Sequence, residues 1–187
     1  MLYRTTILAS AFLANLVLGL EAPIPGYGVE EIQWEVQAFP DGPMMNITGT
    51  LEHVYSELTK INPNYDEFVS SLEAERAVDA RSVEKRFGPV CGSAGYGWEY
   101  AIKNDIQEGI SYLRGVSGQP SMGPGPGNCG RVSCSYDSAI WWCNDNTDTF
   151  SLPGFYTIAD CAQVLSDACA YPIGNGFEGV VGQNFVS

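Results

Sequence analysis

Six cysteines are the side chains of this chain whose type and placement best define a chemistry, and all of them lie beyond residue 90. They are Cys91, Cys129, Cys134, Cys143, Cys161 and Cys169. An even number of cysteines within about 100 residues predicts three disulfides in an oxidising compartment, and the spacing leaves their pairing open. Zinc binding fits less well, because only Cys129 and Cys134 approach a paired ligand spacing and the single histidine, His53, lies far from them.

Catalytic side chains have weaker support than disulfides. With one histidine, which lies outside the cysteine-rich segment, no Ser-His-Asp or Cys-His arrangement can form there. Residues 144–148 begin like a calcium loop, but Thr149 replaces the required glycine and Phe155 replaces the required glutamate. Acidic pairs for glycoside hydrolysis could be drawn from Glu99, Asp137, Asp145 and Asp148, as in any acidic protein. We therefore expect no enzyme, no cofactor and no metal, and a small hydrolase is the least favoured alternative.

A surface for binding is the better prediction, and it centres on a hairpin between Arg131 and Asn144. If the hairpin turns at Asp137-Ser138, alternation places one set of side chains on the core face: Val132, Cys134, Tyr136, Ala139, Trp141 and Cys143. Ile140 and Trp142 then lie on the other face. That face is either covered by helices, or Trp142 is an exposed anchor for a partner or a sugar ring, with Asn144 and Asp145 beside it.

The rest of the cysteine-rich segment predicts two helices and a last strand around this hairpin. Apolar residues at helical spacing predict a helix over 102–113, and residues 121–127, rich in glycine and proline, predict an irregular loop. A second helix begins near Thr157 and ends before Pro172, and residues 176–185 follow as a strand. This order predicts an α+β fold, a small disulfide-stapled sandwich of two helices on an antiparallel sheet, in which the second helix is joined to the hairpin.

Composition divides the chain into three parts. Arg4 and the apolar run 7–18 have the order of a signal peptide over residues 1–22, and the run is too short to span a membrane. Residues 23–86 contain no cysteine, and they end in the basic pair Lys85-Arg86. We expect a kexin-type processing protease to cut there, which makes 23–86 a propeptide and 87–187 the mature cysteine-rich domain. The alternative is a two-domain protein whose linker stays intact.

The expected propeptide has a small structure of its own. Residues 32–39 alternate apolar and polar side chains, 40–43 form a turn, and 44–48 return as a second strand. A helix follows Thr50 and stops at Asn62-Pro63. Residues 70–86 have the charged composition of an exposed linker. Asn46 begins an N-glycosylation triplet, and the secretory route makes its use a hypothesis.

Strong negative charge excludes two classes of partner. The net charge is −13, and residues 87–187 carry 9 acidic and 3 basic side chains. A nucleic-acid binder needs a basic face to displace the counterions of the phosphates, and anionic lipid headgroups attract basic segments for a similar reason. We therefore expect a secreted, extracellular protein with no nucleic-acid partner and no stable membrane insertion.

One stretch of residues adds a resemblance to known proteins. The six cysteines behind a dibasic site, with Cys129 to Cys134 running into Ala139 to Asp145, resemble the small cysteine-rich secreted effectors of filamentous fungi. Over residues 91–187, the order of elements is similar to that of the necrosis-inducing extracellular effectors and the α/β-sandwich smut killer toxins. This resemblance implies an effector or toxin-like protein that binds a host or competitor target. A protein that binds cell-wall glycan is the alternative, which Trp142 with Asn144 and Asp145 would favour.

Overall fold

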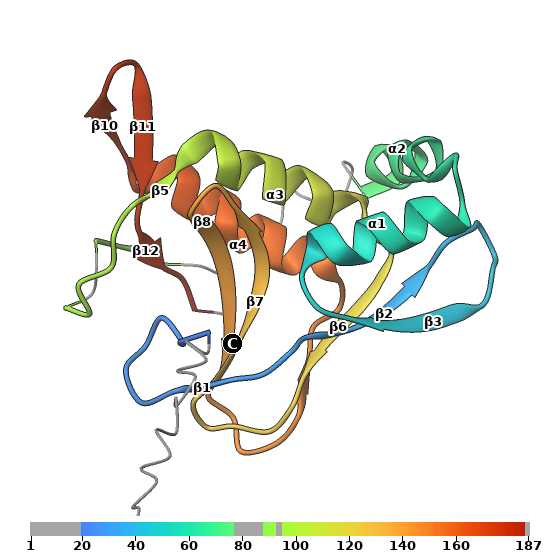
Figure 1. Ribbon diagram of the computed structural model, residues 1–187, viewed down its shortest axis with the longest axis horizontal. Coiled ribbons are helices and arrows are strands. Elements are labelled where there is room, and N and C mark those ends of the chain that lie inside the picture. Colours follow the sequence, from blue (N-terminus) through green and yellow to red (C-terminus); the bar gives the residue numbers. More distant parts are fainter. Residues whose placement is uncertain (1–19, 77–87, 93–94, 186–187) are drawn as a thin grey trace, which may run out of the picture.

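The computed structural model describes residues 20–76, 88–92 and 95–185, and for 71–76 only the backbone (Figure 1). Most of the expected signal peptide and the Lys85-Arg86 pair lie outside the described residues. The helices are α1 (Leu51–Ile61), α2 (Tyr65–Arg76), α3 (Lys103–Gly115) and α4 (Phe155–Ala168). None of the helices in the described ranges has the length and apolar content that crossing a membrane would require.

The strands form four sheets within the described residues. One has the order β3 (Met44–Thr48), β2 (Gln33–Gln37), β6 (Gly118–Met122) and β9 (Phe150–Ser151), and a second has β1 (Gly28–Val29), β7 (Asn128–Ser135) and β8 (Ser138–Asn144). A third has β10 (Ala170–Gly174), β11 (Phe177–Val180) and β5 (Ala101–Ile102), and β12 (Gly182–Gln183) pairs with β4 (Val90–Cys91). All strand pairs are antiparallel except β1 with β7. The class predicted from the sequence, α+β with disulfides, is confirmed, but the arrangement of two helices on a single sheet is not what the structure has.

A single hydrophobic core joins the two halves of the chain. Trp34 of β2 and Leu51 of α1 are fully buried in the same cluster as Leu113 of α3 and Phe155 of α4. Helix α3 packs against α4, against the β7–β8 hairpin and against α1 and α2 (Figure 1). The segment predicted to be a propeptide therefore does not form a separate small unit, because its apolar side chains are buried against the cysteine-rich part.

Several local predictions are confirmed and others differ. The strand–turn–strand–helix order of residues 32–61, both long helices of the second half and the loop 123–127 are present. Residues 65–76 are helical where part of a linker was expected, because Tyr65 is buried in the core and a Cβ at Gly115 of α3 would collide with Val69. Residues 118–122 form β6 rather than part of the irregular loop, because they pair with β2.

Two disulfides are present rather than the three expected. Cys91 bonds to Cys169 over a sequence separation of 78 residues, and Cys129 bonds to Cys143 across the β7–β8 hairpin. Cys134 and Cys161 are free thiols. Cys134 is in β7 and Cys161 is in α4. The end of α4 is joined to β4 by the disulfide of Cys169, which directly follows the helix, and not to the hairpin as predicted.

Candidate functional site

Of the two alternatives for the hairpin face that carries Ile140 and Trp142, the structure has the one in which the face is covered. The two central turn residues are Tyr136 and Asp137, both at positive φ, which matches the twist of a tight hairpin. A register shift between Arg131 and Ser133 inserts Val132 as an extra residue in β7. Tyr136, expected in the core, is 85% exposed because it lies in the turn, whereas Val132 is buried as expected. Ile140 is only 8% exposed because α3 packs on its face of the hairpin.

The four residues proposed as a binding surface are therefore structural for the most part. Ile140 faces α3, where a Cβ at Gly109 would contact its side chain. Trp142 is half-buried against the core, with its ring 6.5 Å from that of Phe150. Asn144 is 1% exposed, and its amide group donates to two backbone oxygens of the adjoining loops, at 2.9 Å each. Asp145 alone of the four is exposed.

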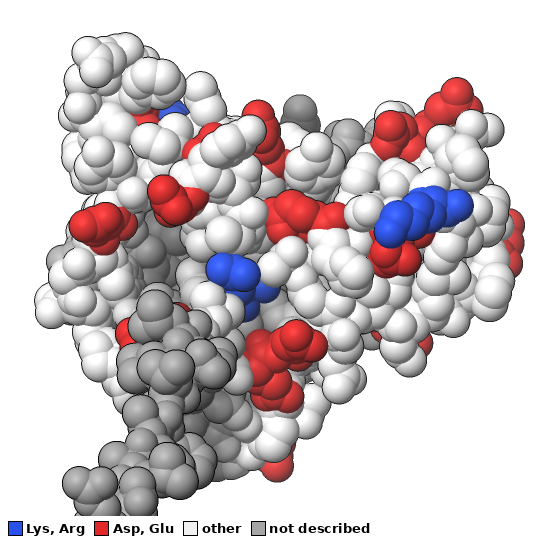
Figure 2. Space-filling view, in the orientation of Figure 1, with Lys and Arg blue, Asp and Glu red and all other residues white. Residues whose placement is uncertain are grey.

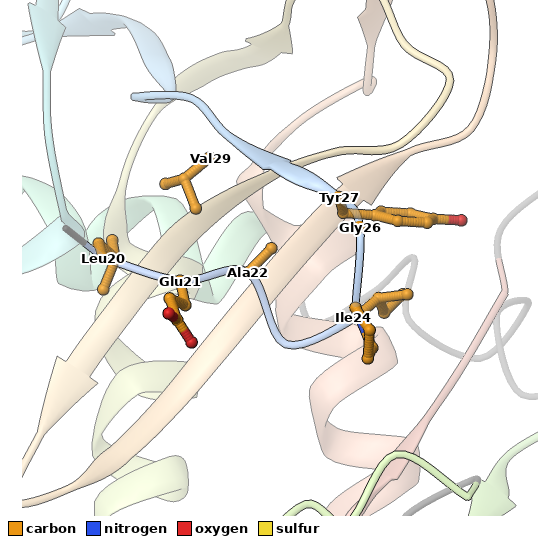
Figure 3. Close-up of a pocket in the computed structure, with 8 residues that line it drawn as sticks. Leu20, Glu21, Ala22, Ile24, Gly26, Tyr27 and Val29 are labelled. Atoms are coloured by element: carbon orange, nitrogen blue, oxygen red, sulfur yellow. The ribbon is translucent and has the colours of Figure 1, made fainter. Parts of the chain in front are cut away.

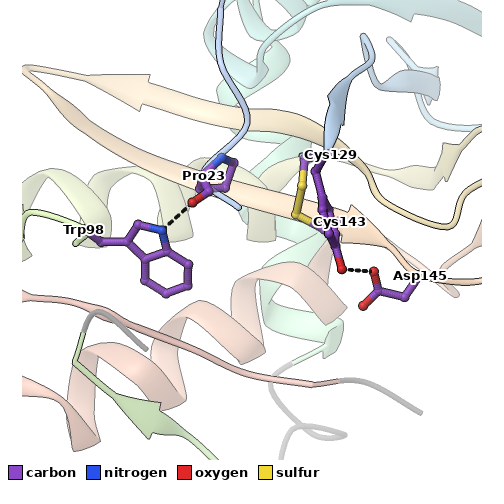
Figure 4. Close-up of a disulfide and its surroundings, with 6 residues drawn as sticks. Pro23, Trp98, Cys129, Cys143 and Asp145 are labelled. Carbon is purple, nitrogen blue, oxygen red and sulfur yellow. Dashed lines mark hydrogen bonds between the residues drawn. A yellow bond between two sulfur atoms is a disulfide. The ribbon is translucent and has the colours of Figure 1, made fainter. Parts of the chain in front are cut away.

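Asp145 belongs to a contact that fastens the first described residues to the hairpin. Its carboxylate accepts a hydrogen bond of 2.8 Å from the hydroxyl of Tyr27, and this bond raises the pKa of Tyr27. Close by, the indole N–H of Trp98 donates to the backbone oxygen of Pro23 (Figure 4). These two contacts tie residues 23–27 to Asp145 and to Trp98, so Asp145 has a structural partner rather than a free carboxylate.

A shallow hollow near the first described residues has no chemistry of its own. It is lined by Leu20, Glu21, Ala22, Ile24, Pro25, Gly26, Tyr27 and Val29. Glu21 and Tyr27 are its ionisable groups, and Figure 3 shows that their side chains do not point toward one another. No converging pair of polar groups is present in this hollow. Across the described residues, no three His, Cys, Asp or Glu side chains gather where they could hold a metal ion.

The best candidate site is an exposed aromatic face on the sheet of β5, β10 and β11. Three of its members are well exposed: Tyr100 at 46%, Tyr171 at 40% and Phe177 at 52%. The rings of Tyr100 and Tyr171 lie 6.2 Å apart and nearly perpendicular, at 87°. Ile173 is the fourth member. We call these four residues, Tyr100, Tyr171, Ile173 and Phe177, the aromatic face.

Gly179 forms the floor of the aromatic face. It lies opposite Tyr171 in the register and on the same side of β11 as Phe177. A Cβ at this position would lie 2.8 Å from Ile173 and 3.0 Å from Tyr100, so any larger residue would push the two side chains apart. Glycine here leaves room for Tyr100, which directly precedes β5, to meet the side chain of Ile173 from β10 over the sheet.

The outer edge of this sheet is poorly suited to pair with a further strand, so its face is the surface that a partner could cover. Asn175 and Gly176 both have positive φ, as a two-residue hairpin turn requires. The outer strand β10 contains Pro172, which lacks an N–H group and so weakens pairing of a further strand. The hairpin projects from the body of the protein, and in Figure 2 it carries few charged side chains while acidic side chains are spread over the rest of that side.

Sequence reasoning missed the aromatic face although a signal was present. Asn175-Gly176 between apolar residues is the strongest short hairpin signal. Residues 176–185 were instead predicted to form a single strand. The side chain that completes the face, Tyr100, comes from about 70 residues earlier, and local patterns do not show such a contact. Neither family models, curated proteins nor solved structures match this chain.

Proposed function

We propose that this is a secreted, effector-like or toxin-like protein that acts by binding a host or competitor target, and that the aromatic face is its binding surface. The single observation that carries the proposal is the group of exposed aromatic side chains around Gly179. Large apolar side chains gathered on a projecting element mark interaction sites, because water contact with such a patch is unfavourable until a partner covers it. Tyrosine is also a frequent anchor in interfaces, since its ring is large and rigid.

Charge narrows the class of target. With a net charge of −13, the protein repels polyanions, so the target is a neutral or basic surface. Among the described residues, the only ion pair next to the aromatic face joins Lys103 to Glu178, at 2.8 Å. Since Glu178 alternates with Phe177 and Gly179 along β11, this pair lies on the opposite side of the sheet. A partner on the aromatic face would thus meet apolar and hydroxyl groups rather than charges.

A glycan of a cell wall is the second candidate target. Sugar rings stack on tyrosine faces, and the phenol hydroxyls of Tyr100 and Tyr171 can hydrogen-bond to them. Of the residues expected to do this from the sequence, Trp142 is half-buried and Asn144 is buried, and the exposed Asp145 accepts from Tyr27. The aromatic face takes their place in this alternative.

We also propose how the protein is secreted and processed. Residues 1–22 act as a signal peptide, a kexin-type protease cuts after Arg86, and the disulfides Cys91–Cys169 and Cys129–Cys143 form on the way. Asn46 is exposed on β3, the edge strand of its sheet, which leaves room for a glycan. Glycosylation there remains a prediction.

Substitution of the aromatic face tests the proposed function. The double variant Tyr171→Ala/Phe177→Ala and the wild type are labelled, and their binding is measured to intact host or competitor cells and, separately, to insoluble chitin and β-glucan. Tyr136→Ala is the matched control, because Tyr136 is even more exposed, lies on the other hairpin and already carries a Cβ at positive φ. We expect the double variant to lose binding with an unchanged melting temperature. Equal binding by the double variant would contradict the proposal, and retention on glycan alone would favour the second candidate.

A further inference from the structure

The contact between residues 20–76 and residues 88–185 is an interface of the kind found inside a single folded unit. Strand β2 lies between β3 and β6, and it pairs with β6 at four positions, from Gln33 with Ser121 to Val36 with Gly118. On its other side β6 is paired with β9 at Ser121 and Met122 alone. Without β2, therefore, most of β6 would have no strand beside it.

The backbones of the two parts approach so closely that the interface depends on glycines. A Cβ at Gly118 would collide with the backbone oxygen of Glu35. A Cβ at Gly130 of β7 would collide with the side chain of Ile32. Each glycine belongs to the cysteine-rich part, and each collision partner belongs to the segment predicted to be a propeptide. The two parts are thus closely fitted to one another, backbone against backbone at Gly118 and backbone against side chain at Gly130.

Buried aromatic rings continue the interface on the side of the helices. Trp34 is fully buried and stacked on Phe155 of α4, with centroids 4.6 Å apart and an interplanar angle of 10°. Its indole N–H donates to the backbone oxygen of Gly49 at 2.8 Å, so the ring is held from its own side as well. Removal of residues 20–76 would leave Phe155 and its neighbours in the core exposed to water, which is unfavourable.

Hydrogen bonds also cross the interface. One carboxylate oxygen of Glu52 in α1 accepts from the Ser133 hydroxyl at 2.6 Å and from the Cys134 backbone N–H at 3.0 Å. No disulfide can replace these contacts, since every cysteine of the chain lies beyond residue 90. A chain cut between the two parts would be held together by non-covalent contacts alone.

We infer that the partner of the cysteine-rich part is the segment before it, so that residues 20–76 and 88–185 remain one particle after any cut between them. The segment predicted to be a propeptide then acts as a permanent strand donor, and the secreted species contains both pieces. This inference does not depend on where natural processing takes place or on what the aromatic face binds.

A cut made on purpose tests the inference in the full chain. Residues 80–86 are replaced by the recognition sequence of a site-specific protease, the folded protein is cut, and a denaturing gel confirms the cut. Native mass spectrometry and size-exclusion chromatography then compare the cut and uncut proteins. We expect one particle with the summed mass of both pieces, which separates only in denaturant. A cysteine-rich piece that elutes by itself and keeps its own cooperative melting transition would overturn the inference. If the folded chain resists the protease, the cut is made in denaturant and the two pieces are refolded together before the same comparison.

Two variants of the cut protein make the test specific to the interface. Trp34→Ala removes the ring stacked on Phe155, and we expect it to raise the dissociation constant of the two pieces by about a hundredfold or more. Phe39→Ala is the matched control, because Phe39 is an aromatic residue that directly follows the same buried run but is 44% exposed. It should leave the dissociation constant within about twofold of the parent. Equal effects of the two variants would contradict the role given to Trp34.

Discussion

The indole of Trp34 lies parallel to the ring of Phe155, 4.6 Å away and tilted by 10°, and both side chains are fully buried. The two residues come from opposite sides of the predicted processing site. Their stacking places the centre of the core on the boundary between the two parts of the chain. The stability of the whole protein should therefore depend on a residue that the sequence assigns to a propeptide.

Trp34→Ala should destabilise the uncut protein by about 3–5 kcal/mol, because it removes a large ring from a closely packed core and leaves a cavity. Chemical denaturation followed by circular dichroism measures this change. Phe39→Ala, on the exposed side of the same segment, should change the free energy of unfolding by less than about 0.5 kcal/mol. A Trp34→Ala protein as stable as the wild type would show that the two parts fold separately.

Glu52→Ala should lower stability by about 1–3 kcal/mol, because the Ser133 hydroxyl and the Cys134 N–H lose their acceptor. Glu52→Gln keeps an oxygen in the same place and should cost less. Thermal or chemical denaturation of both variants distinguishes the loss of an acceptor from the loss of a charge. If glutamine proved as harmful as alanine, the hydrogen bonds would not be the reason.

Intact mass should reveal two disulfides and two free thiols. Because Cys91–Cys169 and Cys129–Cys143 are the two bonds, reduction should add four hydrogens, a gain of about 4 Da. Alkylation in denaturant before reduction should label Cys134 and Cys161. A gain of six hydrogens with no label before reduction would instead support the three disulfides expected from the cysteine count.

Cys161 should react slowly with iodoacetamide in the folded protein. Burial, with a smaller contribution from the negative charge of Asp160, raises the pKa of its thiol from 9.0 to about 12. The thiol therefore stays protonated in the folded state, and the stability it contributes is present below pH 9 and lost as the pH rises from about 9 to about 12. Stability measured against pH for the wild type and Cys161→Ala should diverge in this range. Alkylation at pH 8 as fast as in a short peptide would contradict the buried thiol.

Local patterns predicted much of the structure. Alternation over residues 32–39, the turn at Pro40 and the apolar stripe after Thr50 identify β2, β3 and α1, because each depends on neighbours in the sequence. The same holds for α3, α4 and the existence of the β7–β8 hairpin. In each of these cases the residues that decide the structure lie within one element or one turn.

The rest depends on contacts that a single sequence does not display. The pairing of β2 with β6 joins Trp34 to Pro120 across the chain, and no local signal marks it. Ile140 is buried because α3 packs on its face of the β7–β8 hairpin, and Tyr136 is exposed because it lies in the turn, and alternation along the strands decides neither. Tyr100 and Tyr171 are in contact only in the folded protein, because α3, β7, β8 and α4 all lie between them in the sequence. The candidate site was therefore missed although the class of fold was predicted.

The most direct test of the account is the composition of the native particle in the medium of the producing cells. Purification without denaturant, followed by N-terminal sequencing and intact mass, shows which parts of the chain travel together. We predict two N-termini in one particle, one near Pro23 and one at Phe87, held together without a covalent bond. A folded particle that contains residues 87–187 alone would contradict the account.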